Sequence, residues 1–182
     1  CRAFLFTGVP GTGKTTFARL IASNFGIDTS KDTCNYKEYD GATNTGVDSM
    51  REILSMIQYR PISGIAERIV VIDEAHMLSK SAWNSALKSV EEPPSGVYWV
   101  FCTSEPTKVP KAIFSRCQDF MLRELEDRDI YTLLMSVVFK EDLEVVDGLL
   151  DLLVDFSSGN PREALMGLGK VFACEDLEFA KK

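Results

Sequence analysis

The residues best suited to chemistry lie near the N-terminus, in the segment GVPGTGKT, Gly8 to Thr15. It follows a short apolar run and precedes a stretch with helical periodicity, which is the context of a phosphate-binding loop. Its glycines let backbone N–H groups point at phosphate oxygens, and the positive helix end adds to the attraction. Lys14 can reach the β- and γ-phosphates, and the Thr15 hydroxyl can bind Mg²⁺. A glycine-rich turn that binds nothing is the alternative. The residues expected to bind ATP are Gly8, Val9, Pro10, Gly11, Thr12, Gly13, Lys14, Thr15 and Thr16.

A second site, which is acidic, is predicted in the run IVVIDEAH, at the point where a buried strand ends. Two carboxylates at a strand end are costly to bury unless a cation or hydrogen bonds compensate. Mg²⁺ can compensate Asp73, directly or through water, and Glu74 can then polarise a water that attacks the γ-phosphate. A solvated strand end that happens to be acidic is the alternative, and the phosphate-binding loop disfavours it.

His76 is the only histidine of the chain, and with its neighbours it spells DEAH. Helicases named after that motif pair two such cores in a longer chain and carry a SAT motif, which this sequence lacks. We therefore expect a structural role for His76 after the strand. A lone histidine also cannot form a zinc site.

Strand patterns alternate with helical ones through the first two thirds of the chain, which predicts a parallel sheet with right-handed crossovers. Ser79 is expected to cap one of the helices, and Pro93 and Pro94 to end it. Phe17, Leu20, Ile21 and Phe25 are spaced as the apolar face of the helix after the loop. The expected strands are residues 3–8, 36–41, 68–73, 97–104 and 119–122, and the expected helices are 13–25, 46–57 and 80–92.

The pattern changes after Met121, where three helical segments follow without a strand signal: 127–139, 144–157 and 161–173. Charge changes at the same place: residues 1–121 hold 13 basic and 13 acidic residues, and the rest hold 7 and 14. We expect an ATP-binding core at residues 1–121 and a small acidic, all-helical lid at 122–182.

Composition narrows the function classes further. The 182 residues are 45% hydrophobic with a net charge of −7, which suits one globular domain with a small appendage and disfavours a non-specific nucleic-acid binder. The five cysteines are scattered and form no CxxC pair, so we expect neither disulfides nor zinc, and a reducing, cytoplasmic location. No membrane span or signal peptide is expected. Because Cys1 opens the chain directly before an apolar run, we expect a piece trimmed at its N-terminus.

Several segments together resemble one family. AFLFTGVPGTGKTTFARLIA, YRPISGIAERIVVIDEAHMLSKSAWNSALKSVEEPP, FCTSEPTKVPKAIFSRCQDFML and GNPREAL are similar to the gamma/tau subunit of bacterial DNA polymerase III. This is the ATPase subunit of the sliding-clamp loader, in the AAA+ class. The resemblance implies an α/β fold, an AAA+ P-loop core with a five-stranded parallel sheet followed by a helical lid. It also implies partners: other subunits of a ring-like pentamer, a sliding clamp and primer-template DNA near the nucleoid.

The resemblance also assigns roles to individual residues. Arg116, in the triplet SRC, matches the arginine that reaches into the neighbouring subunit's ATP site, a contribution worth roughly 10³- to 10⁵-fold in rate. Ser104 matches the first sensor, usually threonine or asparagine, with Thr103 as the fallback. Arg162 in GNPREAL matches the second sensor. The alternatives are a surface arginine paired with Asp119, and a solvated helix-end arginine at position 162.

Compared with the family, we expect this piece to lack three features: the cysteine cluster of the zinc module, the N-terminal segment and the C-terminal collar. In such loaders, helix N-termini of the cores follow DNA phosphates, and here Lys80, Asn84 and Lys88 share one helical face. We expect Lys80 and Lys88 to contact DNA, with an ordinary solvated face as the alternative. Two other functions stay open: a non-hydrolysing structural subunit of a clamp loader, and another AAA+ ATPase, such as a branch-migration motor or a replication initiator.

Overall fold

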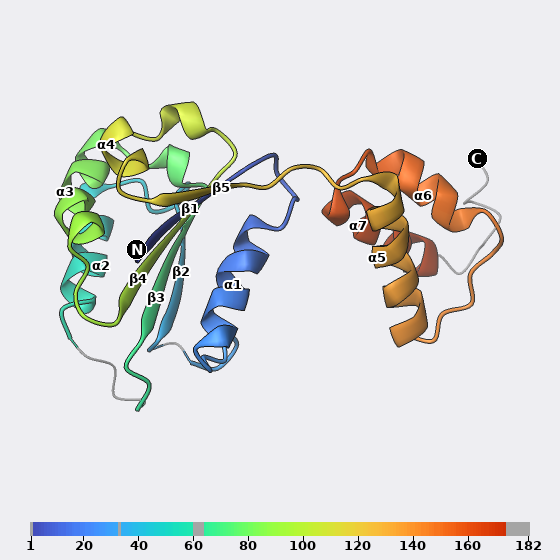
Figure 1. The fold of residues 1–182 in the computed structure, drawn as a ribbon, viewed down its shortest axis with the longest axis horizontal. Coiled ribbons are helices and arrows are strands. Elements are labelled where there is room, and N and C mark those ends of the chain that lie inside the picture. The colour runs from blue at the N-terminus through green and yellow to red at the C-terminus, as the bar shows by residue number, and fades with distance from the viewer. Residues whose placement is uncertain (1, 33, 60–63, 174–182) are drawn as a thin grey trace. The chain divides into compact units, whose positions relative to one another are not determined.

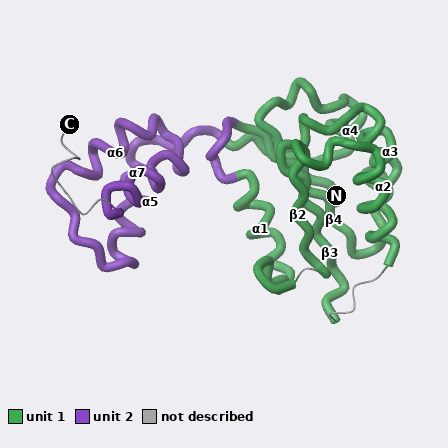
Figure 2. The backbone as a smooth tube through the Cα atoms, turned by 180° about the vertical axis from the view of Figure 1, so that it is seen from behind, with its two compact units in different colours: residues 1–8, 14–122 green, residues 9–13, 123–182 purple. Residues whose placement is uncertain are grey.

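The computed structural model describes residues 2–32, 34–59 and 64–173. The chain divides into two compact units, coloured separately in Figure 2. The first unit comprises residues 1–8 and 14–122, and the second comprises residues 9–13 and 123–182. The expectations for Cys1, Cys174 and the segment 60–63 fall outside the described residues.

A five-stranded sheet of order β2-β3-β4-β1-β5 forms the centre of the first unit (Figure 1). Every neighbouring pair in this sheet is parallel, as the alternation of strands and helices predicts. Because parallel strands end at one edge, the carboxyl ends of β1, β3 and β4 present their following residues together. The strands are β1 (Ala3–Thr7), β2 (Tyr36–Asp40), β3 (Arg68–Asp73), β4 (Val97–Thr103) and β5 (Gln118–Met121).

Helices cover both faces of the sheet (Figure 1). On one face, α2 (Val47–Met56), α3 (Lys80–Glu91) and α4 (Lys111–Phe114) enclose a core that includes Trp83 and Trp99. On the other face, α1 (Lys14–Asn24) covers Ile69, Val71 and their neighbours. Strand β3, which lies between β2 and β4, is buried on both sides, and this explains its continuous β-branched sequence.

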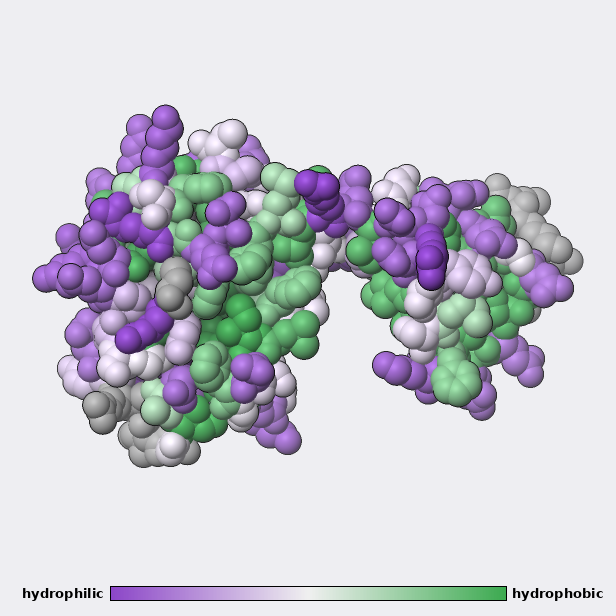
Figure 3. Space-filling model, in the orientation of Figure 1, coloured by the Kyte–Doolittle hydropathy of each residue, from purple (hydrophilic) through white to green (hydrophobic). Residues whose placement is uncertain are grey.

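The predicted apolar face of α1 is wrong in part. Phe17 and Leu20 are 48% and 57% exposed, and the fully buried residues of the helix include Ala18 and Ala22. Small residues let the helix axis approach the sheet closely, so the larger side chains are turned outward. They line an apolar hollow of about 410 Å³ together with Phe4, Ile21, Asn24, Phe25 and Tyr98, and Figure 3 shows apolar residues gathered there.

Residues next to α3 in the sequence determine where this helix begins and ends. The Ser79 hydroxyl accepts a hydrogen bond from the backbone N–H of Ala82 at 3.2 Å, as predicted for a helix cap. The helix ends at Glu91, two residues before Pro93. Two short 3₁₀ turns, η1 (Ala75–Met77) and η2 (Pro106–Lys108), and the four-residue α4 have no counterpart in the sequence prediction.

The second unit contains α5 (Asp127–Lys140), α6 (Leu149–Ser157) and α7 (Pro161–Ala173), which pack around Ile130, Leu134 and Leu168. Helix α6 begins five residues later than the predicted 144, because Gly148 adopts a left-handed conformation with φ 82° directly before it. Among the described residues, no helix is both long and apolar enough to cross a membrane.

Candidate nucleotide-binding and hydrolysis site

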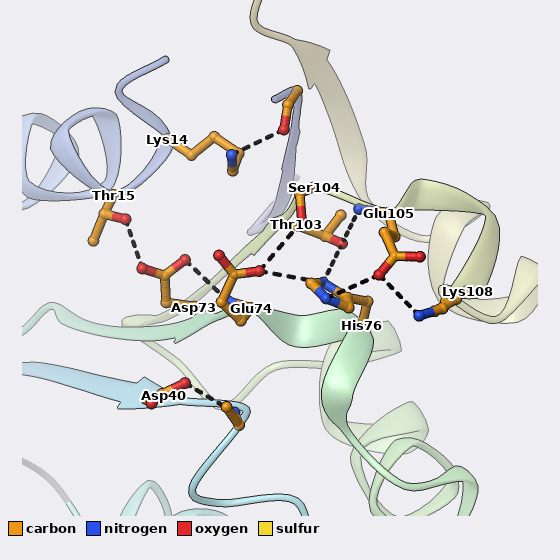
Figure 4. A network of polar contacts seen from close by, with 12 residues as sticks. Lys14, Thr15, Asp40, Asp73, Glu74, His76, Thr103, Ser104, Glu105 and Lys108 are labelled. Atoms are coloured by element: carbon orange, nitrogen blue, oxygen red, sulfur yellow. Dashed lines mark hydrogen bonds and ion pairs between the residues drawn. The ribbon is translucent and has the colours of Figure 1, made fainter. Parts of the chain in front are cut away.

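The base of the phosphate-binding loop brings a lysine and a threonine hydroxyl to the strand ends. Lys14 is 6% exposed, and its Nζ donates to the carbonyl oxygen of Gly8 at 2.9 Å. Thr15 Oγ1 donates to Asp73 Oδ2 at 2.8 Å, across 58 residues of sequence (Figure 4). A hydroxyl and a carboxylate are the hard oxygen ligands that Mg²⁺ prefers. These two side chains therefore fit a magnesium ion at this edge of the sheet.

Glu74 follows β3 with an uncommon backbone conformation. Its φ is 45° and its ψ 43°, in the left-handed region, which is strained by about 1 kcal/mol or more for a residue other than glycine. Its backbone N–H donates to Asp73 Oδ1 at 2.9 Å. Gly41 lies close to this turn, and its N–H donates to the Asp73 carbonyl oxygen at 2.7 Å. The turn separates the two carboxylates: Asp73 lies beside Thr15, and Glu74 beside β4 (Figure 4).

The end of β4 places its two hydroxyl residues differently. Ser104 Oγ donates to Glu74 Oε2 at 3.4 Å. Thr103 is fully buried, and its Oγ1 accepts from the Glu105 backbone N–H at 3.0 Å and lies 3.1 Å from His76 Nδ1. Ser104 is thus the hydroxyl that contacts the acidic site directly, whereas Thr103 faces the histidine.

Arg116 lies just after α4, and its side chain is 33% exposed. Its Nη1 donates to the Ala112 carbonyl oxygen at 2.7 Å. Its Nε lies 3.2 Å from Glu91 Oε2, and its Nη2 donates to Glu91 Oε1 at 3.3 Å. The sequence reasoning considered Asp119 as a partner and missed Glu91, the first glutamate of the EEPP segment. A contact across 25 residues leaves no periodic signal, so only the fold could supply it.

The second unit holds the tip of the phosphate-binding loop and the start of α7. Asn160 Oδ1 accepts from the backbone N–H of Arg162 at 3.0 Å, and its Nδ2 donates to the Pro10 carbonyl oxygen at 2.9 Å. Gly11 has a φ of +87°, which residues other than glycine rarely adopt, and a Cβ there would overlap the Asn160 side chain, so glycine suits this position. Arg162 is exposed near the N-terminus of α7. The sequence reasoning missed Asn160.

The two lysines considered for DNA contact lie on α3. Lys80, Asn84 and Lys88 are all exposed, whereas Trp83, Ala86 and Val90 are buried on the same helix. The three polar residues therefore form one solvent-facing strip, and the apolar stripe packs against the core as predicted.

The fold and this site together define a class. A parallel sheet of this order, with a phosphate-binding loop between β1 and α1 and an acidic end on β3, is the AAA+ P-loop fold. RuvB, the Holliday junction branch migration motor of Thermotoga maritima, is similar in structure with a TM-score of 0.73 and 22% identity over 91% of this chain and 52% of that one. A DNA polymerase III gamma subunit-related protein from Thermotoga maritima has a TM-score of 0.70 and 19% identity over 93% of this chain and 53% of that one.

Sequence comparison then assigns the family. The model described as DNA polymerase III, delta subunit, matches residues 28–126, and the chain belongs to this family. Curated relatives include DNA polymerase III subunit tau of Bacillus subtilis strain 168, 34% identical over 90% of this chain and 32% of that protein. Subunit gamma of Buchnera aphidicola (Schizaphis graminum) is 35% identical over 90% of this chain and 49% of that protein. Subunit tau of Escherichia coli K12 is 34% identical over 96% of this chain and 30% of that protein.

The resemblance to gamma/tau subunits that the sequence motifs indicate is therefore confirmed. The chain spans about a third to a half of the length of these curated relatives.

Proposed function

We propose that the chain is part of an ATP-hydrolysing subunit of a clamp loader, which couples ATP binding and hydrolysis to loading a sliding clamp on primed DNA. The observation that carries this proposal is the 2.8 Å contact between Thr15 and Asp73, with Lys14 and Glu74 beside them. Four residues from two distant parts of the sequence meet where a triphosphate and its magnesium ion would be held. The relatives' name, DNA polymerase III subunit gamma or tau, supports replication as the setting.

Each of these residues has a role that follows from its chemistry. Lys14 binds the β- and γ-phosphates in place of its present partner, the Gly8 carbonyl oxygen. Thr15 and Asp73 hold Mg²⁺, which when bound neutralises charge on the phosphates. Glu74 accepts a hydrogen bond from the attacking water and orients it. Ser104, next to Glu74, acts as the first sensor by contacting the water or the γ-phosphate.

Assembly supplies the remaining cation. We propose that Arg116 acts in trans at the ATP site of a neighbouring subunit in a pentameric, ring-like complex. Its guanidinium is partly exposed, and its three nitrogens contact Glu91 and the Ala112 carbonyl oxygen, so its direction is set before a neighbour arrives. Residues 1–121 would form the ATP-binding core and residues 122–182 the lid, in which Arg162 serves as the second sensor.

A structural subunit that does not hydrolyse ATP is the second candidate, since the matching family model carries the name of the delta subunit. The complete set of Lys14, Thr15, Asp73 and Glu74 favours hydrolysis, because a purely structural subunit has no need of it. A branch-migration motor is the third candidate, suggested by the likeness to RuvB. The gamma and tau relatives, about a third identical over most of the chain, favour the clamp loader instead.

The proposed partners are other clamp-loader subunits, a sliding clamp and primer-template DNA, in the cytoplasm at the nucleoid. The exposed strip with Lys80 and Lys88 would contact DNA phosphates without regard to sequence. Replacing both lysines with glutamate should weaken the stimulation of ATP turnover by DNA. Unchanged stimulation would exclude this contact.

The proposal is tested by ATP turnover of the full-length protein, assembled with its partner subunits, with and without clamp and primed DNA. Stimulation by both is expected. ATP binding without turnover would identify a structural subunit, and turnover indifferent to the clamp would identify a different AAA+ motor.

Three variants test the assigned roles in the same assay. Lys14→Ala should abolish ATP binding. Glu74→Gln should bind ATP and lose turnover by at least about 100-fold, the range of general base catalysis. Arg116→Ala should leave ATP binding by its own subunit intact and stop turnover at the neighbouring site. Normal hydrolysis by assembled Arg116→Ala would disprove the trans role.

A further inference from the structure

His76 lies in the centre of a polar network that reaches the proposed catalytic carboxylate (Figure 4). Its side chain is 8% exposed, in the turn η1 directly after Glu74 and Ala75. Nδ1 lies 3.1 Å from Thr103 Oγ1 and 3.4 Å from Glu74 Oε2. Nε2 lies 3.4 Å from Glu105 Oε1. A buried ring between two carboxylates and a hydroxyl has its orientation fixed at both nitrogens.

Donor and acceptor chemistry restricts how this network is connected. A carboxylate only accepts, so a hydrogen bond between the ring and Glu105 requires a proton on Nε2. The Glu105 backbone N–H donates to Thr103 Oγ1 at 3.0 Å, which leaves the hydroxyl proton of Thr103 for another acceptor. In the neutral ring that acceptor is Nδ1. When both nitrogens carry protons, Nδ1 can instead donate to Glu74 Oε2.

The charged groups that face the ring come from three elements. Glu74 follows β3, Glu105 follows β4, and Lys108 in η2 lies 2.8 Å from Glu105 Oε1. The hydrogen bond from Lys108 and the nearby charges hold the pKa of Glu105 below its usual value, so Glu105 remains an acceptor at neutral pH. Lys108 thus fixes Glu105, and Glu105 fixes the ring.

We propose that His76 is a positioning residue that holds the carboxylate of Glu74 in the orientation needed for hydrolysis, and that Glu105 holds His76. This inference rests on the proposed ATPase function. His76 Nδ1 and Ser104 Oγ both approach Glu74 Oε2, each at 3.4 Å. With a proton on Nδ1, the ring and the Ser104 hydroxyl both donate to this one carboxylate oxygen, which directs the other, Oε1, at the attacking water. Distances of this length are common in structures without substrate and shorten when the reacting complex forms.

The test uses three variants in the full-length protein within its assembled complex. His76→Gln places an amide near the Nε2 position and loses the contact with Glu74, whereas His76→Asn places an amide near Nδ1 and can keep it. Glu105→Gln removes the charge that orients the ring. A misplaced reacting group costs on the order of 100-fold in rate. We expect kcat to fall about 10- to 100-fold in His76→Gln, with ATP affinity changed less than about twofold, and His76→Asn to recover most of the loss.

The matched control is Asp28→Asn. Asp28 and Lys31 form an ion pair at i and i+3, as Glu105 and Lys108 do. The Asp28–Lys31 pair lies in the loop after α1. This control should keep wild-type turnover, whereas Glu105→Gln should lose turnover in the same direction as His76→Gln. Thermal unfolding of each variant identifies any variant that fails to fold. The variants that do fold still test whether His76 positions Glu74.

Two results would overturn the proposal: wild-type turnover in His76→Gln, or equal losses of kcat and ATP affinity in both histidine variants, which would indicate a purely structural role. If the proposed ATPase function itself is wrong, the assays give a different result. In that case the wild-type complex itself does not hydrolyse ATP, or Glu74→Gln hydrolyses it normally.

Discussion

Replacing Gly41 with alanine tests how tightly the acidic strand end is packed. A Cβ at this position would lie 2.6 Å from the carbonyl oxygen of Glu74 and 2.9 Å from that of Asp73. Both neighbours are backbone atoms, so no side chain can rotate away. The Gly41 N–H also donates to the Asp73 carbonyl oxygen at 2.7 Å, which ties the end of β2 to the end of β3. The added methyl group therefore forces the two strand ends apart.

The size of the effect follows from these distances. Carbon atoms pack best at about 3.5 Å or more, so the backbone must move by about 1 Å. Overpacking of this kind costs about 1–3 kcal/mol of stability. The segment that moves carries Glu74, the proposed catalytic carboxylate, and a displacement of about 1 Å at such a group would reduce the rate on the order of 100-fold. The expected result is a large loss of kcat with a modest loss of stability.

The assay combines urea unfolding, ATP affinity and steady-state ATP turnover of the assembled complex. Gly46→Ala is the control, because a Cβ there would lie 4.0 Å from the backbone nitrogen of Asp48, an ordinary contact, and the φ of −81° suits alanine. The control should keep its turnover and lose little stability. If Gly41→Ala hydrolyses ATP at the wild-type rate with wild-type stability, the packing argument for the strand end is refuted.

Three further outcomes are expected. Arg68→Met should lose about 3 kcal/mol in urea unfolding, because the buried guanidinium donates to the carbonyl oxygens of Cys34, Met56 and Tyr59 at 2.7–3.0 Å; a loss below about 1 kcal/mol would contradict this. At pH 8, iodoacetamide should modify the exposed Cys34 before Cys102 and Cys117, and mass spectrometry would measure the order of modification. Burial raises the pKa of Cys102 and raises that of Cys117 to about 12, which leaves little of the reactive thiolate at either residue. Glu91→Gln should reduce turnover several-fold in the assembled complex without weakening ATP binding, because Arg116 loses its ionic partner; unchanged turnover would show that Glu91 does not orient Arg116.

The sequence could predict what depends on local patterns. The buried strands, the loop with its glycines and the Ser79 cap each follow from residues within a few positions of one another, and the structure contains all of them. The meeting of Thr15 with Asp73 follows indirectly, since parallel strands bring their carboxyl ends to one edge. Local pattern and topology together therefore suffice to predict that these groups lie close together.

Other features depend on packing that no local pattern encodes. The outward turn of Phe17 and Leu20 reflects how closely α1 approaches the sheet, and the helical period alone does not tell which side is buried. The left-handed backbone of Glu74 has no sequence signal, because non-glycine residues adopt it only when the surrounding structure imposes it. The partners of His76 and Arg116 come from positions 27 and 25 residues away.

The segment that begins at Ser104 connects both sides of the proposed mechanism. Its first residues contact Glu74 and His76, which would serve the ATP bound by this chain. Its last residue, Arg116, would serve the ATP of a neighbour, and only η2 and α4 lie between. A shift of the strand end on ATP binding would be carried through two short helical turns to the arginine. The order of residues along the chain thus places the proposed sensor of one site and the proposed donor to the next within one short, structured segment. If hydrolysis in the complex is coordinated between subunits, this segment is the shortest covalent path along which that coordination can pass.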